Sequence, residues 1–171
     1  LDGINRGLEE TRAAVWSLRT GAFEGTGLLD CLSRAAREAD FLDRVVVQVK
    51  APVDFPLLIH VPSPLKWHLS CIVREAVSNA VRHGKAANVV VSMARERDRL
   101  IVSVHDDGQG FSPNGQAAWV TNGHYGVAGM RERSARLRGT LEIESTPGEG
   151  THVTVALPWP LADRKPQDKL L

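Results

Sequence analysis

The stretch SVHDDGQGF contains residues for two different kinds of chemistry. His105, Asp106 and Gln109 follow the pattern H-D-x-x-Q, in which a histidine could accept a phosphoryl group. Asp106, Gly108 and Gly110 follow D-x-G-x-G, a glycine-rich turn that could hold a nucleotide. The neighbouring elements decide between these two interpretations.

The alternation of side chains along RLIVSVHD distinguishes the two interpretations. Successive side chains of a strand point to opposite faces, so Leu100, Val102 and Val104 share the face that packs on a core. Asp106 has their parity, whereas His105 points away from the core. A phosphate-accepting histidine of this pattern also needs a helix, and His105 ends a predicted strand. We therefore interpret the stretch as a nucleotide-binding turn.

An aspartate that enters a core at a strand end is costly unless a donor hydrogen-bonds it. The amino group of a purine would serve as that donor, with Gly108 and Gly110 allowing the backbone to approach closely. The ordinary explanation is an acidic turn residue, and D-x-G-x-G alone is weak evidence. Further signals are needed.

The helical stretch REAVSNAVRHG supplies the second signal. Glu75, Asn79 and Arg82 stand at i, i+4 and i+7 and form one polar line. An amide oxygen is a hard ligand for Mg²⁺, an arginine binds phosphate, and a carboxylate orients a water or takes a proton. A solvated face with an i,i+4 pair is the usual alternative, but it does not explain the neutral Asn79. The apolar stripe beside this line consists of Leu69, Ile72, Val73, Ala76, Val77 and Ala80.

The third signal is the glycine-rich stretch NGHYGVAGMRERSARLRG. We expect Gly126 and Gly129 to precede a helix whose N-terminal amides would meet phosphate oxygens. Residues 111–125 would close over a nucleotide as a lid. Trp119 and Tyr125 would stack or shield there, or simply anchor the loop.

The last strand adds a residue on the core face. Thr151 has the parity of Val153 and Val155, so it points inward, near Asp106 if the two strands are neighbours. His152 faces out.

One layer of helices on a mostly antiparallel sheet is predicted for residues 44–160, which makes the fold an α/β (α+β) two-layer sandwich. Ser63 is expected to cap the long helix, with Pro64 in its first turn. Helices are predicted at 1–20, 28–43, 63–83 and 128–138, strands at 44–49, 88–94, 99–105, 140–146 and 151–158, and an extended piece at 56–61.

Composition narrows the class of protein. The 171 residues suffice for one domain with an appendage, and a net charge of +1 argues against electrostatic nucleic-acid binding. No apolar run is long enough to cross a membrane. Cys31 and Cys71 form neither a disulfide framework nor a metal cluster, so we expect a cytoplasmic location.

The first twenty residues carry an a/d seam of fewer than three heptads, made of Leu1, Ile4, Leu8, Thr11, Val15 and Leu18. So short a seam needs a partner helix outside this chain, or else the helix lies on its own domain. Because the chain starts at Leu1 and not at Met, we expect a piece of a longer protein.

Three boxes in order resemble the GHKL ATPase superfamily: REAVSNAVRHG the N box, DDGQGF the first glycine box, and GVAGMRER the second. More narrowly, YGVAGMRERSARLRGTLEIESTPGEGTHVTVALP is similar to the catalytic ATP-binding domain of sensor histidine kinases that partner NarL/LuxR-type response regulators. The resemblance covers about residues 28–160 and implies the Bergerat fold.

The resemblance implies that Asp106 recognises adenine, Asn79 holds Mg²⁺, Thr151 makes a water-mediated adenine contact, and Arg82 and His83 lie near phosphate. It implies Glu75 as the catalytic residue that assists phosphoryl transfer. The nucleotide site implied in full is Asn79, Arg82, His83, Asp106, Gly108, Gly110, Gly126, Gly129, Met130 and Thr151.

The stretch RGLEETRAAVWSLRT is similar to the end of the second dimerisation helix of these kinases. Residues 1–24 are then a remnant of the dimerisation region and its linker, 25–160 the catalytic domain, and 161–171 a polar tail. The histidines of the chain are His60, His68, His83, His105, His124 and His152. None of them lies on a predicted helix before the catalytic domain in an H-D or H-E context. The acceptor is absent, and we expect no autophosphorylation by this chain alone.

The leading hypothesis is therefore a histidine kinase domain that binds Mg-ATP and donates its γ-phosphate to a histidine on an absent helix. The expected partners are ATP, the dimerisation helices of the parent kinase and a NarL/LuxR-type regulator, with no nucleic acid and no membrane contact. The alternatives are a serine kinase of the anti-sigma type and a nucleotide-sensing module without transfer activity.

Overall fold

The structure is a computed structural model that describes residues 23–39, 45–52, 61–112 and 125–159. The predicted helix at 1–20, most of the extended piece at 56–61 and nearly all of the lid lie outside these residues. The described elements in chain order are α2 (Leu28–Ala39), β1 (Val46–Lys50), α3 (Ser63–Asn79), the π-helical turn η2 (Ala80–Gly84), β2 (Asn88–Glu96), β3 (Arg99–Asp106), α5 (Tyr125–Arg136), β4 (Thr140–Thr146) and β5 (Gly150–Pro158).

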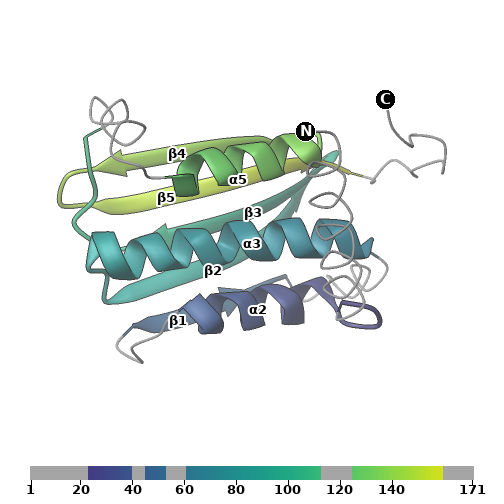
Figure 1. Cartoon of the computed structure of the whole chain (residues 1–171), viewed down its shortest axis with the longest axis horizontal. Helices are drawn as coiled ribbons and strands as arrows, with labels where there is room; N and C mark the ends of the chain where they lie inside the picture. The colour runs from purple at the N-terminus through teal and green to yellow at the C-terminus, as the bar shows by residue number, and fades with distance from the viewer. Residues whose placement is uncertain (1–22, 40–44, 53–60, 113–124, 160–171) are drawn as a thin grey trace, which may run out of the picture.

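The strands form one sheet in the order β1-β2-β3-β5-β4, in which only β1 and β2 pair in parallel. Helices α2, α3 and α5 all cover one face of this sheet (Figure 1). The predicted two-layer sandwich with a mostly antiparallel sheet is confirmed.

The central strand β3 alternates as the sequence predicted. Leu100, Val102 and Val104 are at most 3% exposed and face the helices. Val102 sits between Met93 of β2 and Val155 of β5, both buried. Each such side chain contributes about 1.5–3 kcal/mol when fully buried, so this row anchors the strand that ends at Asp106.

Helix α3 lies over the middle of the sheet, and its predicted apolar stripe is buried throughout. The predicted cap is wrong: the residue before the helix is Pro62, Ser63 is the first helical residue, and no side chain caps it. Pro64 stands in the first turn as predicted, where a missing N–H leaves no hydrogen bond unmade.

The end of this helix also differs from the prediction. The α-helix stops at Asn79, and the wider turn η2 continues to Gly84 before Lys85 adopts a left-handed φ of 54°. The amide of Ala86 returns to the carbonyl of Ala80 at 3.1 Å and closes the widened turn. The last carbonyls of η2, those of His83 and Gly84, accept hydrogen bonds from Gln109.

Helix α5 begins three residues earlier than predicted, so the expectation that Gly126 and Gly129 precede it is wrong. Both are helical. Glycine at position 126 leaves room for the Glu75 carboxylate, which a β-carbon there would overlap. The helix ends at Arg136, where the amide of Gly139 bonds to the carbonyl of Ser134 at 2.9 Å.

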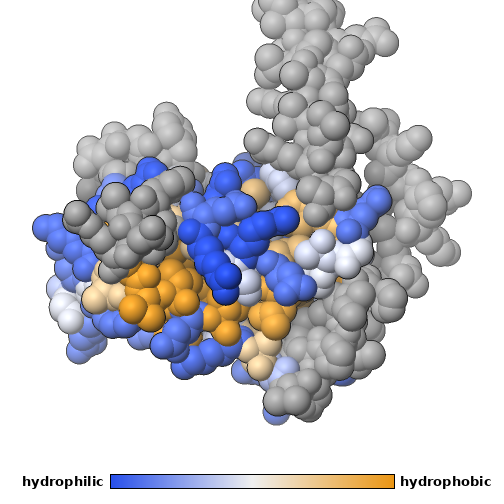
Figure 2. Space-filling model, turned by 90° about the horizontal axis from the view of Figure 1, so that it is seen from below, coloured by the Kyte–Doolittle hydropathy of each residue, from blue (hydrophilic) through white to orange (hydrophobic). Residues whose placement is uncertain are grey.

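Helix α2 buries the predicted face made of Leu28, Leu32, Ala35, Ala36 and Ala39, while Leu42 lies outside the described residues. Figure 2 looks onto this helix and the β1 edge, where apolar residues lie beside the charged outer side of α2. Val46 of β1 is 56% exposed there.

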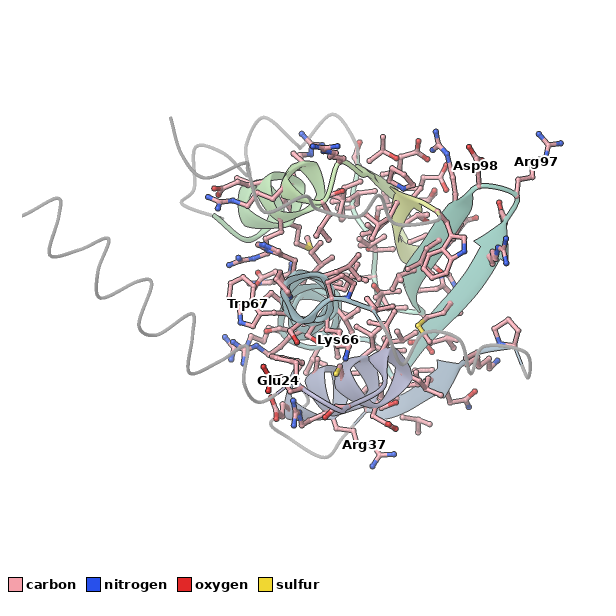
Figure 3. All side chains as sticks on the ribbon, turned by 90° about the vertical axis from the view of Figure 1, so that its right-hand side faces the viewer. Glu24, Arg37, Lys66, Trp67, Arg97 and Asp98 are labelled. Carbon is pink, nitrogen blue, oxygen red and sulfur yellow. The ribbon has the colours of Figure 1, made fainter. Side chains whose placement is uncertain are left out.

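The segment before α2 is fastened to α3 by a buried cation. Lys66 is 3% exposed, and its Nζ donates to the carbonyls of Phe23 at 3.1 Å and Thr26 at 2.6 Å. Figure 3 shows Lys66 between α3 and α2. The Arg34 guanidinium lies 5.4 Å from the Phe23 ring centroid and adds a cation–π contact.

The turn between β4 and β5 offers a matched test of close backbone approach. Gly148 and Gly150 have nearly the same φ, 86° and 84°. A β-carbon at Gly148 meets nothing within 4 Å, whereas one at Gly150 would overlap the carbonyl of Asp106. We expect Gly148→Ala to cost about 1 kcal/mol of stability through backbone strain alone. Gly150→Ala should cost at least about 2 kcal/mol more, measured by urea unfolding. Equal losses would contradict this packing.

Candidate functional site

A cavity of about 140 Å³ opens between α3, η2, the first turns of α5 and the ends of β3, β4 and β5. Its lining residues are Ala76, Asn79, Ala80, His83, Gly84, Val104, Asp106, Gln109, Gly110, Phe111, Val127, Met130, Ile143, Thr151 and Val153. Segments that are up to 77 positions apart in the sequence therefore share one pocket.

Six of the residues that the sequence singled out line this cavity: Asn79, His83, Asp106, Gly110, Met130 and Thr151. The remaining five lie outside the lining. Glu75 packs against Gly126, Gly108 lies against Asp106, Gly129 is in α5, and Arg82 is exposed on η2.

Asp106 is the buried polar residue at the inner end of the cavity, 6% exposed. Its Oδ1 accepts the Gly108 N–H at 2.9 Å, and its backbone partner across the sheet is Thr151. Burial raises the pKa of the Asp106 carboxyl above its usual value, and hydrogen bonds from the Gly108 and Thr151 amides offset part of that rise. A poorly solvated carboxylate of this kind favours a ligand that brings a hydrogen-bond donor.

His105 lies on the opposite face, exposed, with its ring 5.6 Å from that of His152. The parity argument is therefore confirmed for His105, Asp106 and Thr151. No helix presents His105, which agrees with its rejection as a phosphate acceptor.

The turn after β3 makes close contact with the end of η2. A β-carbon at Gly108 would come within 2.6 Å of the Gly84 carbonyl oxygen and 2.7 Å of Asp106 Oδ1. Gly110 has a φ of 57°, and a β-carbon there would overlap the Thr146 carbonyl. Glycine is required at both positions because the end of η2 approaches the turn at Gly108 and the end of β4 approaches it at Gly110.

The two variable positions of D-x-G-x-G fasten this turn to neighbouring segments, Asp107 to the start of β2 and Gln109 to η2. The Asp107 carboxylate accepts the amides of Ala87 and Asn88, both at 2.8 Å, and the Asn88 Nδ2 at 2.7 Å. Gln109 donates its backbone N–H to the Gly84 carbonyl and its Nε2 to the His83 carbonyl, both at 2.7 Å. The hydrogen bonds from Asn88 hold the pKa of Asp107 below its usual value.

Sequence reasoning missed these positioning roles because the motif treats both residues as variable. Only the pairing of β2 with β3 brings Asn88 beside Asp107.

The walls of the cavity are apolar, and apart from Met130 their residues were missed as site residues. Val104, Ile143 and Val153 come from the sheet, Ala76 and Ala80 from the α3–η2 side, and Val127, Met130 and Phe111 complete the lining. Strand and helix periodicity identified several of them only as core. An apolar pocket with a carboxylate at its inner end suits a flat heteroaromatic ring that carries an amino group.

The outer part of the site is polar. Asn79 and His83 follow one another on α3 and η2, and the first turn of α5 lies nearby through the contact of Gly126 with Glu75. The free amides at a helix start attract anions. This arrangement can hold the phosphate groups of a nucleotide.

Comparison with known proteins agrees with this geometry. Residues 66–161, more than half of the chain, match the family described as histidine kinase-, DNA gyrase B- and HSP90-like ATPases. The chain belongs to this family. Its resemblance to the ATP-binding domain of sensor histidine kinases is thereby confirmed.

Individual relatives point the same way. The sensor histidine kinase LiaS of Bacillus subtilis is 33% identical over 152 residues, which are 87% of this chain and 39% of LiaS. The nitrate/nitrite sensor NarX of Escherichia coli is 38% identical over 95 residues, 56% of this chain and 15% of NarX. The ATP-binding domain of PrrB from Mycobacterium tuberculosis superimposes with a TM-score of 0.60 at 26% identity, covering 79% of this chain and 96% of that domain. The chain thus spans well under half the length of these two sensors.

The hydrogen bonds between Asn88 and Asp107 can be tested by exchanging the two side chains. Asp107→Asn places two amide donors face to face, and Asn88→Asp places two carboxylates face to face. Each single variant should lose up to about 1 kcal/mol of unfolding free energy, because the pair is solvent-exposed. The double variant restores one donor and one acceptor and should recover most of the loss in urea unfolding at pH 7. Additive losses would show that the two side chains do not interact.

Proposed function

We propose that residues 25–160 are the catalytic ATP-binding domain of a sensor histidine kinase. The domain binds Mg-ATP and donates the γ-phosphate to a histidine on a dimerisation helix of the parent protein. The observation that carries the proposal is Asp106, a buried carboxylate with a raised pKa at the end of an apolar pocket in a member of this ATPase family.

Adenine fits the inner part of the site by its chemistry. Its amino group donates to Asp106, and its ring lies between the apolar walls, with Thr151 beside the carboxylate. The triphosphate then extends towards Asn79, Arg82 and His83 and the start of α5. Positioning and electrostatic complementarity of this kind supply most of the catalysis in phosphoryl transfer.

The residues present fit Mg²⁺ bound jointly with the nucleotide. The Asn79 side chain lines the cavity and offers an amide oxygen, and no cluster of three acidic, histidine or cysteine ligands exists among the described residues. Mg²⁺ usually takes one or two protein oxygens and completes its shell with phosphates and water. When bound, it neutralises phosphate charge. Glu75, one helical turn before Asn79, is the residue that we propose to assist the transfer.

The remaining assignments extend the proposal to the parent protein. Residues 1–24 are the end of a dimerisation helix with its linker, and 161–171 are a polar tail. The cognate partner is a NarL/LuxR-type response regulator, supported by the similarity to NarX, and the site of action is the cytoplasm. No described helix is long and apolar enough to span a bilayer. The curated relatives reported above are sensor proteins, which does not favour the anti-sigma serine kinase alternative.

Asp106→Asn tests nucleotide binding. The substitution removes the charged acceptor, so ATP affinity should fall by about 10- to 100-fold in calorimetric titration with Mg²⁺. Asp98→Asn is the matched control. Asp98 is exposed in the β2–β3 turn (Figure 3), and the β2–β3 pairing puts this turn at the other end of β3 from Asp106. Its substitution should leave ATP affinity unchanged.

The stability of the nucleotide-free protein provides a second readout. Because the folded-state pKa of Asp106 is raised, the protonated form is the better accommodated one. Wild type should therefore gain stability relative to Asp106→Asn as pH falls through that raised pKa towards 4, and lose the gain as pH rises.

Absence of ATP binding by wild type would refute the proposed function.

Transfer is tested with ATP labelled on its γ-phosphate. The chain alone should remain unlabelled, and a fragment carrying both dimerisation helices of the parent kinase should acquire acid-labile label on histidine when added. Label on a serine would support the anti-sigma alternative. ATP binding without any transfer would support the nucleotide-sensing alternative.

A further inference from the structure

Ser145, near the end of β4, joins three segments that surround the base-binding end of the cavity. Its Oγ accepts the backbone N–H of Phe111 at 2.9 Å and lies 2.9 Å from the carbonyl oxygen of Gly150. It also lies 3.1 Å from the Oγ1 of Thr151, its neighbour across the β4–β5 pair. Ser145 does not itself line the cavity, so its effect on a ligand passes through its neighbours, of which Phe111 and Thr151 line it.

Counting the protons in these contacts determines the direction of each hydrogen bond. A hydroxyl group offers one proton and two lone pairs. The Phe111 amide only donates and the Gly150 carbonyl only accepts, so Ser145 gives its single proton to Gly150. The contact between Ser145 and Thr151 then requires the proton of Thr151.

This assignment fixes what Thr151 offers to the cavity. With its proton directed at Ser145, the Thr151 hydroxyl presents only lone pairs to a ligand. Asp106, opposite Thr151 across the β3–β5 pair, is also an acceptor when ionised, and its Oδ1 already holds the Gly108 N–H. The polar end of the cavity therefore presents acceptors from both strands.

We propose that Ser145 is a positioning residue that holds the Thr151 hydroxyl as an acceptor and thereby selects purines with an amino group over purines with a carbonyl at the same ring position. The inference rests on the proposed function, because it concerns the base of the nucleotide bound there. Adenine places an amino group where hypoxanthine has an oxygen, so ATP and ITP differ in hydrogen-bond polarity at this end while sharing ribose and triphosphate.

A purely structural role of Ser145 has a different signature. Loss of its bonds to Phe111 and Gly150 would loosen the turn after β3 and weaken both nucleotides alike. Loss of its hold on Thr151 frees a proton that can turn towards the oxygen of ITP. The ratio of ATP to ITP affinity separates the two roles, whatever happens to the absolute affinities.

The experiment is calorimetric titration of the full chain with Mg-ATP and Mg-ITP, with urea unfolding of each variant as the check of folding. Wild type should prefer ATP. Ser145→Ala should lower the ATP-to-ITP affinity ratio by about fivefold, the worth of one neutral hydrogen bond, and Ser145→Thr, which keeps a hydroxyl, should retain the ratio. Thr151→Val should also lower it. In the Thr151→Val background, Ser145→Ala should change the ratio by less than about twofold, because the two residues act through one group.

Each contrary result has a distinct meaning. An unchanged ratio in Ser145→Ala, with both affinities reduced together, would overturn the inference and leave only a structural role. If Ser145→Ala does not fold, an unchanged ratio in Thr151→Val overturns it equally. A wild type that binds ATP and ITP equally well defeats the inference while the proposed function stands, and a wild type that binds neither defeats both.

Discussion

A carboxylate buried at the end of the central strand is the constraint around which this site is arranged. Asp106 lies on the core face of β3, where burial disfavours its ionised form, and hydrogen bonds from the Gly108 and Thr151 amides offset only part of that cost. Folding alone does not explain a carboxylate here, because an apolar side chain at this position would make the folded state more stable. Its cost makes sense for a ligand that completes the hydrogen bonding, and the apolar walls beside it confine that ligand to a flat ring.

The turn that follows Asp106 is held from two sides. On one side, Asp107 and Gln109 bond to the start of β2 and to the last carbonyls of η2. On the other side, the β4–β5 turn approaches so closely that Gly110 and Gly150 admit no β-carbon. This double support explains how a glycine-rich loop keeps a defined shape, and it explains the widened helix end, whose carbonyls bond to the turn and not to a further helical turn.

Much of the fold was predictable because periodicity reports burial directly. The alternation in β3 placed Asp106 inward and His105 outward, and the helical period of α3 identified its buried stripe. Helix ends were less predictable. Ser63 is not a cap, and α5 starts before Gly126. The glycine at 126 does not mark a helix boundary; it leaves room for the Glu75 carboxylate, which a β-carbon would overlap. Local propensity carries no information about such a neighbour.

The sequence by itself determined the two-layer architecture, the face on which each strand residue lies, and the motif residues Asn79, Asp106 and Thr151 as candidates for one site. These follow from the spacing of residues along the chain, because the strand and helix periods determine which way each side chain points. Only the tertiary structure decided that Asp107 pairs with Asn88, that Gln109 holds η2, and that Ser145 contacts Thr151, Gly150 and Phe111 at once. Such contacts depend on strand order and register, which bring distant residues within hydrogen-bond distance and which no local pattern encodes.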